Sequence, residues 1–195
     1  MSRATLERWS TLAAVLGGVV FVASNLFLVG ADYEDFADTL TTRAFTTHTV
    51  LFWSAATFFL FGLVGLYTRQ AERAGLLGFS GFLVAFVGTA FALATTWSET
   101  FGLAVLAEEA PELVDDPPGR VAAGLYISFP LFVLGWLLFA VASLRAGVLQ
   151  RRPVVGLIVG AAALVPSLAV PGVGALFGAA VAWLGYAELR SERPS

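Results

Sequence analysis

Long apolar stretches without a charged residue constrain this chain more than any other feature. Five of them contain no Asp, Glu, Lys or Arg, and a sixth has only Glu188 at its edge; they are Trp9–Val29, Thr47–Tyr67, Leu76–Trp97, Val121–Leu144, Pro153–Val170 and Gly172–Leu189. Each is close to the roughly 20 residues that a helix needs to cross about 30 Å of hydrocarbon. An unpaired charge in hydrocarbon costs about 2.5–3.5 kcal/mol. The pattern predicts an all-α, polytopic membrane bundle of six transmembrane helices, forming a single domain over residues 1–195.

The arginines predict how this bundle is oriented. Nine of the eleven basic residues fall on one side of the expected membrane, and only Arg43 and Arg120 fall on the other. The side richer in arginine is cytoplasmic in most membrane proteins. We therefore expect a multi-pass protein of the cell membrane with both termini in the cytoplasm and acidic outer loops.

Small residues predict where helices meet, because lipid provides no hydrophobic force that drives helices together. Gly156 and Gly160 form a GxxxG pattern in the fifth stretch, and Gly174 and Gly178 form another in the sixth. Joined by a turn at Pro171-Gly172, the two faces predict a tightly packed hairpin. Packing within the chain is the favoured interpretation, and pairing with itself or with another membrane protein is the alternative. The lipid bilayer is the other expected partner, and no nucleic acid is expected.

The first outer loop contains a run of acidic residues in the sequence ADYEDFAD, including Asp32, Glu34 and Asp38. Several oxygen ligands at this spacing resemble the start of a cation-binding loop. The DxDxDG order, the turn glycine and the distal glutamate of an EF-hand are missing. A solvated acidic loop is therefore favoured over a metal site, and no cofactor is expected.

The second outer loop, Ser98–Arg120, predicts a short amphipathic helix on the outer surface, between the third and fourth stretches. Apolar residues recur there at helical spacing, with acidic residues between them: Leu103, Leu106, Ala110, Leu113 and Val114. We expect the chain to break after Trp97. The alternative is that the third helix continues outward.

His48 and Glu99 are candidates for a polar site at the outer face. His48 is the single histidine, at the outer start of the second stretch, and Glu99 follows the third stretch. Adjacent antiparallel helices can bring the two side chains together, with His48 as acid, base or ligand and Glu99 orienting it. The favoured alternative is that His48 anchors a helix end.

Three residues deep in the apolar stretches are candidates for binding a ligand. The indole N–H groups of Trp53 and Trp136 each need a partner inside the bundle or a slot against lipid. Asn25 is the most polar side chain in this region and should find a partner across a helix interface.

The residue inventory limits the possible chemistry. Cysteine is absent and there is one histidine, which excludes disulfides, thiolate metal sites and multi-histidine centres. Walker, Rossmann, HExxH and nucleophile-elbow motifs are absent. The sequence favours a non-enzymatic membrane protein such as a scaffold, accessory subunit or sensor. Two alternatives are a transporter or binder of a small apolar or lipid-like ligand, and a membrane enzyme with an outer site at His48 and Glu99.

Three segments carry a family resemblance: GLYTRQAERAGLLGFSGFLVAFVGTA (65–90), WLLFAVASLRAGVLQRRPVVGLIVGA (136–161) and AWLGYAELR (182–190). They resemble a group of uncharacterised small multi-span membrane proteins of actinobacteria, related bacteria and haloarchaea. The resemblance extends over most of the chain from the second stretch onward. It implies a fold and a membrane location, and no functional residue follows from it.

Overall fold

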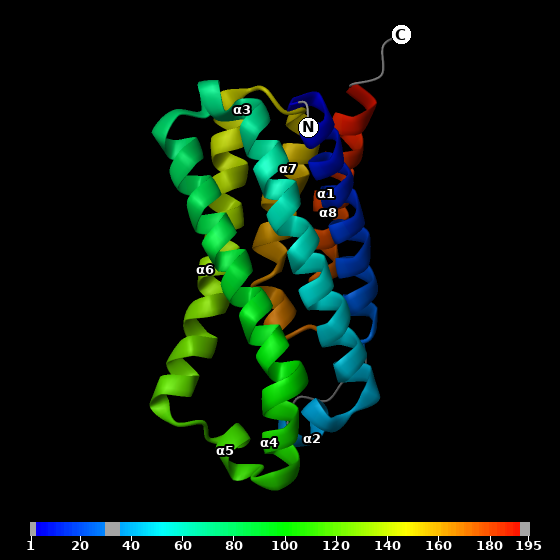
Figure 1. Ribbon diagram of the computed structural model, residues 1–195, viewed down its shortest axis with the longest axis vertical. Helices are drawn as coiled ribbons and strands as arrows, with labels where there is room; N and C mark the ends of the chain where they lie inside the picture. Colours follow the sequence, from blue (N-terminus) through cyan, green and yellow to red (C-terminus); the bar gives the residue numbers. More distant parts are fainter. Residues whose placement is uncertain (1–2, 30–35, 192–195) are drawn as a thin grey trace.

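The computed structural model describes residues 3–29 and 36–191 as an elongated helical bundle. The start of α1 and the end of α8 lie at one end of the bundle, and α2, α4 and α5 lie at the other (Figure 1). In chain order the elements are α1 (Arg3–Leu26), α2 (Phe36–Thr41), α3 (Arg43–Ser98), the π-helix η1 (Glu99–Leu103), α4 (Ala104–Glu109), α5 (Glu112–Asp115), α6 (Gly119–Ala146), α7 (Arg151–Ala163), the 3-10 helix η2 (Pro166–Leu168) and α8 (Ala175–Ser191). The described residues contain no β-strand, so the all-helical class is as expected.

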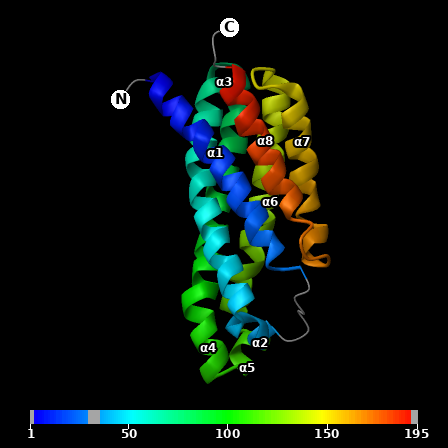
Figure 2. The same ribbon diagram turned by 90° about the vertical axis from the view of Figure 1, so that its right-hand side faces the viewer.

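The prediction of six transmembrane helices is wrong. In the described part of the chain, three helices are long and apolar enough to cross a membrane, namely Thr5–Leu26, Arg43–Glu109 and Gly119–Ala146. Helices α7 and α8 have only 13 and 17 residues, or about 20 and 26 Å at 1.5 Å per residue, against roughly 30 Å of hydrocarbon. The turn between them lies part-way down the bundle (Figure 2).

The fifth predicted span ended too late and the sixth began too early, because apolar composition does not reveal where a helix begins or ends. Helix α7 ends at Ala163 and Pro166 begins η2, since proline cannot donate the next helical hydrogen bond. After η2 the chain runs through turns to Gly172, whose φ of 88° is in the left-handed region. Most of the residues between Ala163 and Ala175, which were expected in two long helices, therefore form the connection together with η2.

The predicted second and third spans belong to one helical element. Helix α3 runs for 56 residues and is non-helical only at Gly75, with φ 57° and ψ −156°. Glycine adopts this conformation without the steric cost that a Cβ would impose. The chain folds back there, so that the arms of α3 before and after Gly75 run in opposite directions (Figure 1). Tyr67 and Phe82 stack across the fold, with ring centroids 4.5 Å apart.

An aromatic core lies in the middle of the bundle and joins four helices. Trp136 on α6 is fully buried, and its ring centroid lies 5.1 Å from Phe177 on α8 and 5.6 Å from Phe59 on α3. Phe21 on α1 completes the group, 5.4 Å from Phe177. Rings at these distances and tilts contribute roughly 0.5–1.5 kcal/mol per pair beyond the area they bury.

The predicted break after Trp97 is wrong, and the alternative that the helix continues outward is the observed one. Ser98 makes no side-chain cap, and both Ser98 and Glu99 have helical dihedral angles. The helix continues through η1 into α4 and ends at Ala110, before Pro111.

The apolar stripe of the second outer loop packs in part against protein, while Leu113 is 42% exposed. It was predicted to lie on the membrane surface, but instead it forms a second, smaller core with α2 and the start of α3. The buried members of this core are Ala37, Leu40, Phe45, Ala107 and Val114, with Leu103 and Leu106 packed against them. The sequence pattern identified Leu103, Leu106 and Val114 of this core but not Ala107, and the neighbouring helix α2 contributes Ala37 and Leu40 to it.

Candidate functional site

His48 lies at the interface of α1 and the first arm of α3 and is 8% exposed. Its Nδ1 atom is 2.8 Å from the Ser24 hydroxyl and 3.1 Å from the Ser24 carbonyl oxygen. The Ser24 hydroxyl donates in turn to the His48 backbone carbonyl at 3.0 Å. Because a carbonyl oxygen only accepts, these contacts assign the proton of a neutral ring to Nδ1. His48 thus joins two helices through reciprocal hydrogen bonds.

Glu99 begins η1 and is half-buried. Over residues 3–29 and 36–191, its carboxylate has no hydrogen bond or ion pair, and the polar contacts of the His48 ring go to Ser24. The described structure therefore does not join the two residues by a hydrogen bond. A role for the pair in acid–base chemistry stays a prediction.

The three ligand candidates occupy different environments. Trp136 is fully buried, and its indole N–H donates to Thr89 Oγ1 at 3.0 Å. Asn25 donates to the Phe21 carbonyl at 2.9 Å, within its own helix, and packs against Gly174. The buried indole nitrogen of Trp53 has no hydrogen-bond partner in the described structure. No described hydrogen bond or ring contact joins the three into one site.

The acidic loop falls largely outside the described residues, which exclude Asp32 and Glu34. Asp38 lies in the first turn of α2. Across the described ranges, no three His, Cys, Asp or Glu side chains are grouped so that they can hold a metal ion.

A buried polar cluster that the sequence analysis missed ties the helices together at the end where α1 begins. Arg69 and Glu188 form an ion pair at 3.4 Å, with side chains only 12% and 6% exposed. The Arg69 guanidinium also donates to Thr11 on α1 at 3.1 Å. Glu188 accepts from the backbone N–H of Gln150 at 3.0 Å, just before α7. One carboxylate therefore links α8 to α3 and to the start of α7.

The sequence offered one signal for this cluster. Glu188 is the single acid at the edge of an otherwise uncharged stretch, and a buried acid requires a partner. The sequence does not indicate which arginine is the partner of Glu188, because Arg69 is 119 residues away along the chain.

Gln70, the next residue on α3, makes a second buried contact at the same end. It is 1% exposed, and its Nε2 donates to Ser143 on α6 at 2.7 Å. Its Oε1 is buried without a hydrogen-bond partner in the described structure. The amide thus joins α3 to α6 through one of its two polar atoms.

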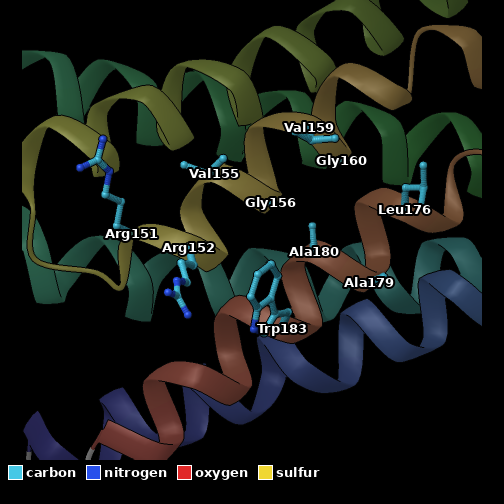
Figure 3. A pocket seen from close by; sticks show the side chains of 10 residues that line it. All are labelled: Arg151, Arg152, Val155, Gly156, Val159, Gly160, Leu176, Ala179, Ala180 and Trp183. Carbon is cyan, nitrogen blue, oxygen red and sulfur yellow. The ribbon is translucent and has the colours of Figure 1, made fainter.

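A groove of about 630 Å³ runs between α7 and α8 (Figure 3). Two arginines lie at one end of it, and its remaining walls are apolar. The lining residues are Arg151, Arg152, Val155, Gly156, Val159, Gly160, Leu176, Ala179, Ala180 and Trp183.

The glycines expected to pack the two helices together have different neighbours. A Cβ on Gly156 would meet the Trp183 ring of α8 at 2.9 Å, whereas a Cβ on Gly178 would meet the Gly18 carbonyl oxygen of α1 at 2.7 Å. The GxxxG face of α8 therefore packs on α1. The expected hairpin of two glycine faces is therefore wrong for α8, whereas Gly160 of α7 does pack on α8, since a Cβ there would lie 2.9 Å from the Phe177 Cα. The groove lies beside this α7 face.

Both arginines at the groove end are exposed, and in the described part of the chain neither side chain has a hydrogen bond or ion pair. None of the residues lining the groove is acidic. No protein family, curated protein or solved structure gives a match for this chain.

Proposed function

We propose that this chain is a non-enzymatic integral membrane protein that acts as a scaffold or accessory subunit. One observation carries the membrane location. Large apolar side chains stay exposed along the long helices, among them Val19 on α1, Phe61 and Phe91 on α3, and Leu134 on α6. Contiguous apolar surface of this kind is disfavoured in water and typical of contact with lipid or protein.

The distribution of arginine supports an orientation within the membrane. The fold of α3 at Gly75, the end of α6 and the start of α7 lie at the end of the bundle where α1 begins (Figure 1). These helix ends carry five arginines: Arg69, Arg73, Arg145, Arg151 and Arg152. Arg43 and Arg120 begin helices at the opposite end. By the positive-inside rule, the end rich in arginine is the cytoplasmic one.

The interior supports a structural role. Aromatic rings fill the middle of the bundle, and the Arg69–Glu188 ion pair with its Thr11 and Gln150 contacts ties together helices far apart in the sequence. Side chains held in this way favour a rigid body that presents its outer faces to lipid and partners.

Location and orientation are tested by single-cysteine labelling, for which the absence of native cysteine is an advantage. We expect a membrane-impermeant maleimide added to intact cells to label Glu112→Cys. Ser191→Cys should be labelled only after the cells are opened, and Phe61→Cys should stay protected until detergent is added. Recovery of the protein as a monomer in detergent-free buffer would contradict the proposal, and labelling of Ser191→Cys in intact cells would reverse the orientation.

The scaffold role is tested by photocrosslinking in cells from the exposed positions Phe61 and Leu134. We expect at least one of them to form a discrete cross-link with a second membrane protein. Glu112, which lies beyond the apolar part of the bundle, is the control position. Absence of a discrete product from both exposed positions would count against a scaffold or accessory subunit.

A further inference from the structure

We propose that the groove between α7 and α8 binds one anionic phospholipid, with its phosphate at Arg151 and Arg152 and an acyl chain along the apolar walls. The inference rests on the proposed membrane location. It adds a specific ligand site that neither the scaffold role nor the sequence candidates Asn25, Trp53 and Trp136 require.

The arginine end supplies the charge that a phosphate requires. A guanidinium offers a planar set of donors that matches phosphate oxygens. In the described structure, Arg151 and Arg152 have no acidic partner that would compete for them, and no acid lines the groove. They also occupy the first turn of α7, where unpaired backbone N–H groups add to the positive potential. Basic pockets between membrane helices on the cytoplasmic side characteristically take anionic lipid headgroups.

The rest of the groove distinguishes a lipid from a free anion. From the arginines the walls continue as Val155 and Val159 on α7 and Leu176 on α8, with Trp183 beside Arg152 (Figure 3). A free phosphate would contact only the charged end of the groove. A phospholipid has a charged headgroup followed by apolar chains, which matches the order of charged and apolar residues along the groove. Trp183 is 47% exposed, and its amphipathic ring suits the boundary between headgroup and acyl chain.

Glycine keeps the groove open. A Cβ on Gly156 would lie 2.9 Å from the Trp183 ring, so a larger side chain there would occupy the space or displace the ring. The volume of about 630 Å³ falls within the roughly 300–1,000 Å³ typical of ligand pockets.

The test measures phosphatidylglycerol retained by the detergent-purified protein by native mass spectrometry, with chain-matched phosphatidylcholine as the reference lipid. We expect selective retention of phosphatidylglycerol. The double variant Arg151→Gln/Arg152→Gln should weaken that retention about 10- to 30-fold, as expected for two arginines near a lipid phosphate. The matched control Arg145→Gln/Arg190→Gln removes two charges from the same end of the bundle but outside the groove, and should change retention less than about twofold.

Two further variants separate the apolar part of the site from its charged part. Gly156→Leu should reduce phosphatidylglycerol retention by filling the groove. Val155→Glu, at an exposed position, should reduce it by placing a carboxylate one turn from both arginines, and it serves if Gly156→Leu fails to fold.

Several results would overturn the site. Equal losses in the two double-arginine variants would indicate general charge attraction. Full retention of phosphatidylglycerol by folded Gly156→Leu, or displacement of the lipid by inorganic phosphate alone, would indicate a site that binds an anion but does not bind an acyl chain. Because binding is measured in detergent, failure here is distinguishable from failure of the membrane location, which the cysteine labelling reports.

Discussion

The interface between α3 and α6 and the interface between α7 and α8 both contain glycines, but the glycine nearest the start of α7, Gly156, faces a side chain instead of backbone. A Cβ on Gly135 of α6 would lie 2.5 Å from the backbone of Ala85, and one on Gly88 would lie 2.5 Å from the Leu131 carbonyl oxygen. On α7, a Cβ on Gly160 would likewise lie 2.9 Å from the Phe177 Cα, but the neighbour of Gly156 is the tip of the Trp183 ring. Glycine opposite backbone brings two helices into contact, and glycine opposite a large side chain leaves space beside it.

The polar contacts of these two interfaces also differ. The α3–α6 interface is joined at two depths, by Trp136 with Thr89 and by Gln70 with Ser143. The described side-chain contacts that join α8 to the start of α7 lie at one end, where Gln150 donates to Glu188 and to the Ala187 carbonyl. The α7–α8 interface is therefore held by hydrogen bonds at one end and by the close approach of Gly160 to the Phe177 backbone further along.

The variant with the largest expected effect tests the polar contacts that join α8 to the start of α7. Replacing Glu188 by Ala removes the acceptor for the Gln150 N–H and the carboxylate that pairs with the buried Arg69 guanidinium. Breaking a buried ion pair in this way costs about 3–5 kcal/mol. Unfolding in mixed micelles titrated with SDS should show a loss of this size, whereas Glu72→Ala, at an exposed position on the same end, should change stability by less than about 0.5 kcal/mol. Similar stability of the two variants would show that the cluster does not hold the helices.

The next effect compares glycines in the two interfaces. Gly135→Ala forces the backbones of α3 and α6 apart and should destabilise the protein by about 1–3 kcal/mol. Gly156→Ala should cost less than about 1 kcal/mol, because a ring tip can move aside more readily than backbone. The same unfolding titration measures both. Equal losses would mean that the α7–α8 interface is as closed as the α3–α6 interface.

The smallest effect sharpens the contrast between tryptophans with and without a partner. Trp136→Phe removes the hydrogen bond to Thr89 and should cost about 1–2 kcal/mol, part of it from the smaller ring. Trp53→Phe removes an indole N–H that has no hydrogen-bond partner in the described structure, so its cost should be close to that of the lost area alone. A larger loss for Trp53→Phe would indicate that its N–H is satisfied by a group outside the described residues.

Some of the site could be predicted from the sequence and some could not. His48 was expected at the outer start of a helix, either anchoring that helix or paired with Glu99; its bonds to Ser24 depend on how α1 packs on α3. The α7–α8 groove was anticipated only as a glycine face. The arginines beside it were interpreted as orientation signals, because a sequence does not show which side chains surround them.

The sequence by itself determined that the chain is helical, that its long helices are apolar enough to cross a membrane, and where charge is excluded, because these properties depend on local composition. Tertiary structure decided where the apolar runs break into helices and turns, and how Arg69 finds Glu188. It also decided that the GxxxG face of α8 packs on α1 rather than on α7. Apolar side chains and glycines pack comparably well against many surfaces, so only the assembled bundle selects among them.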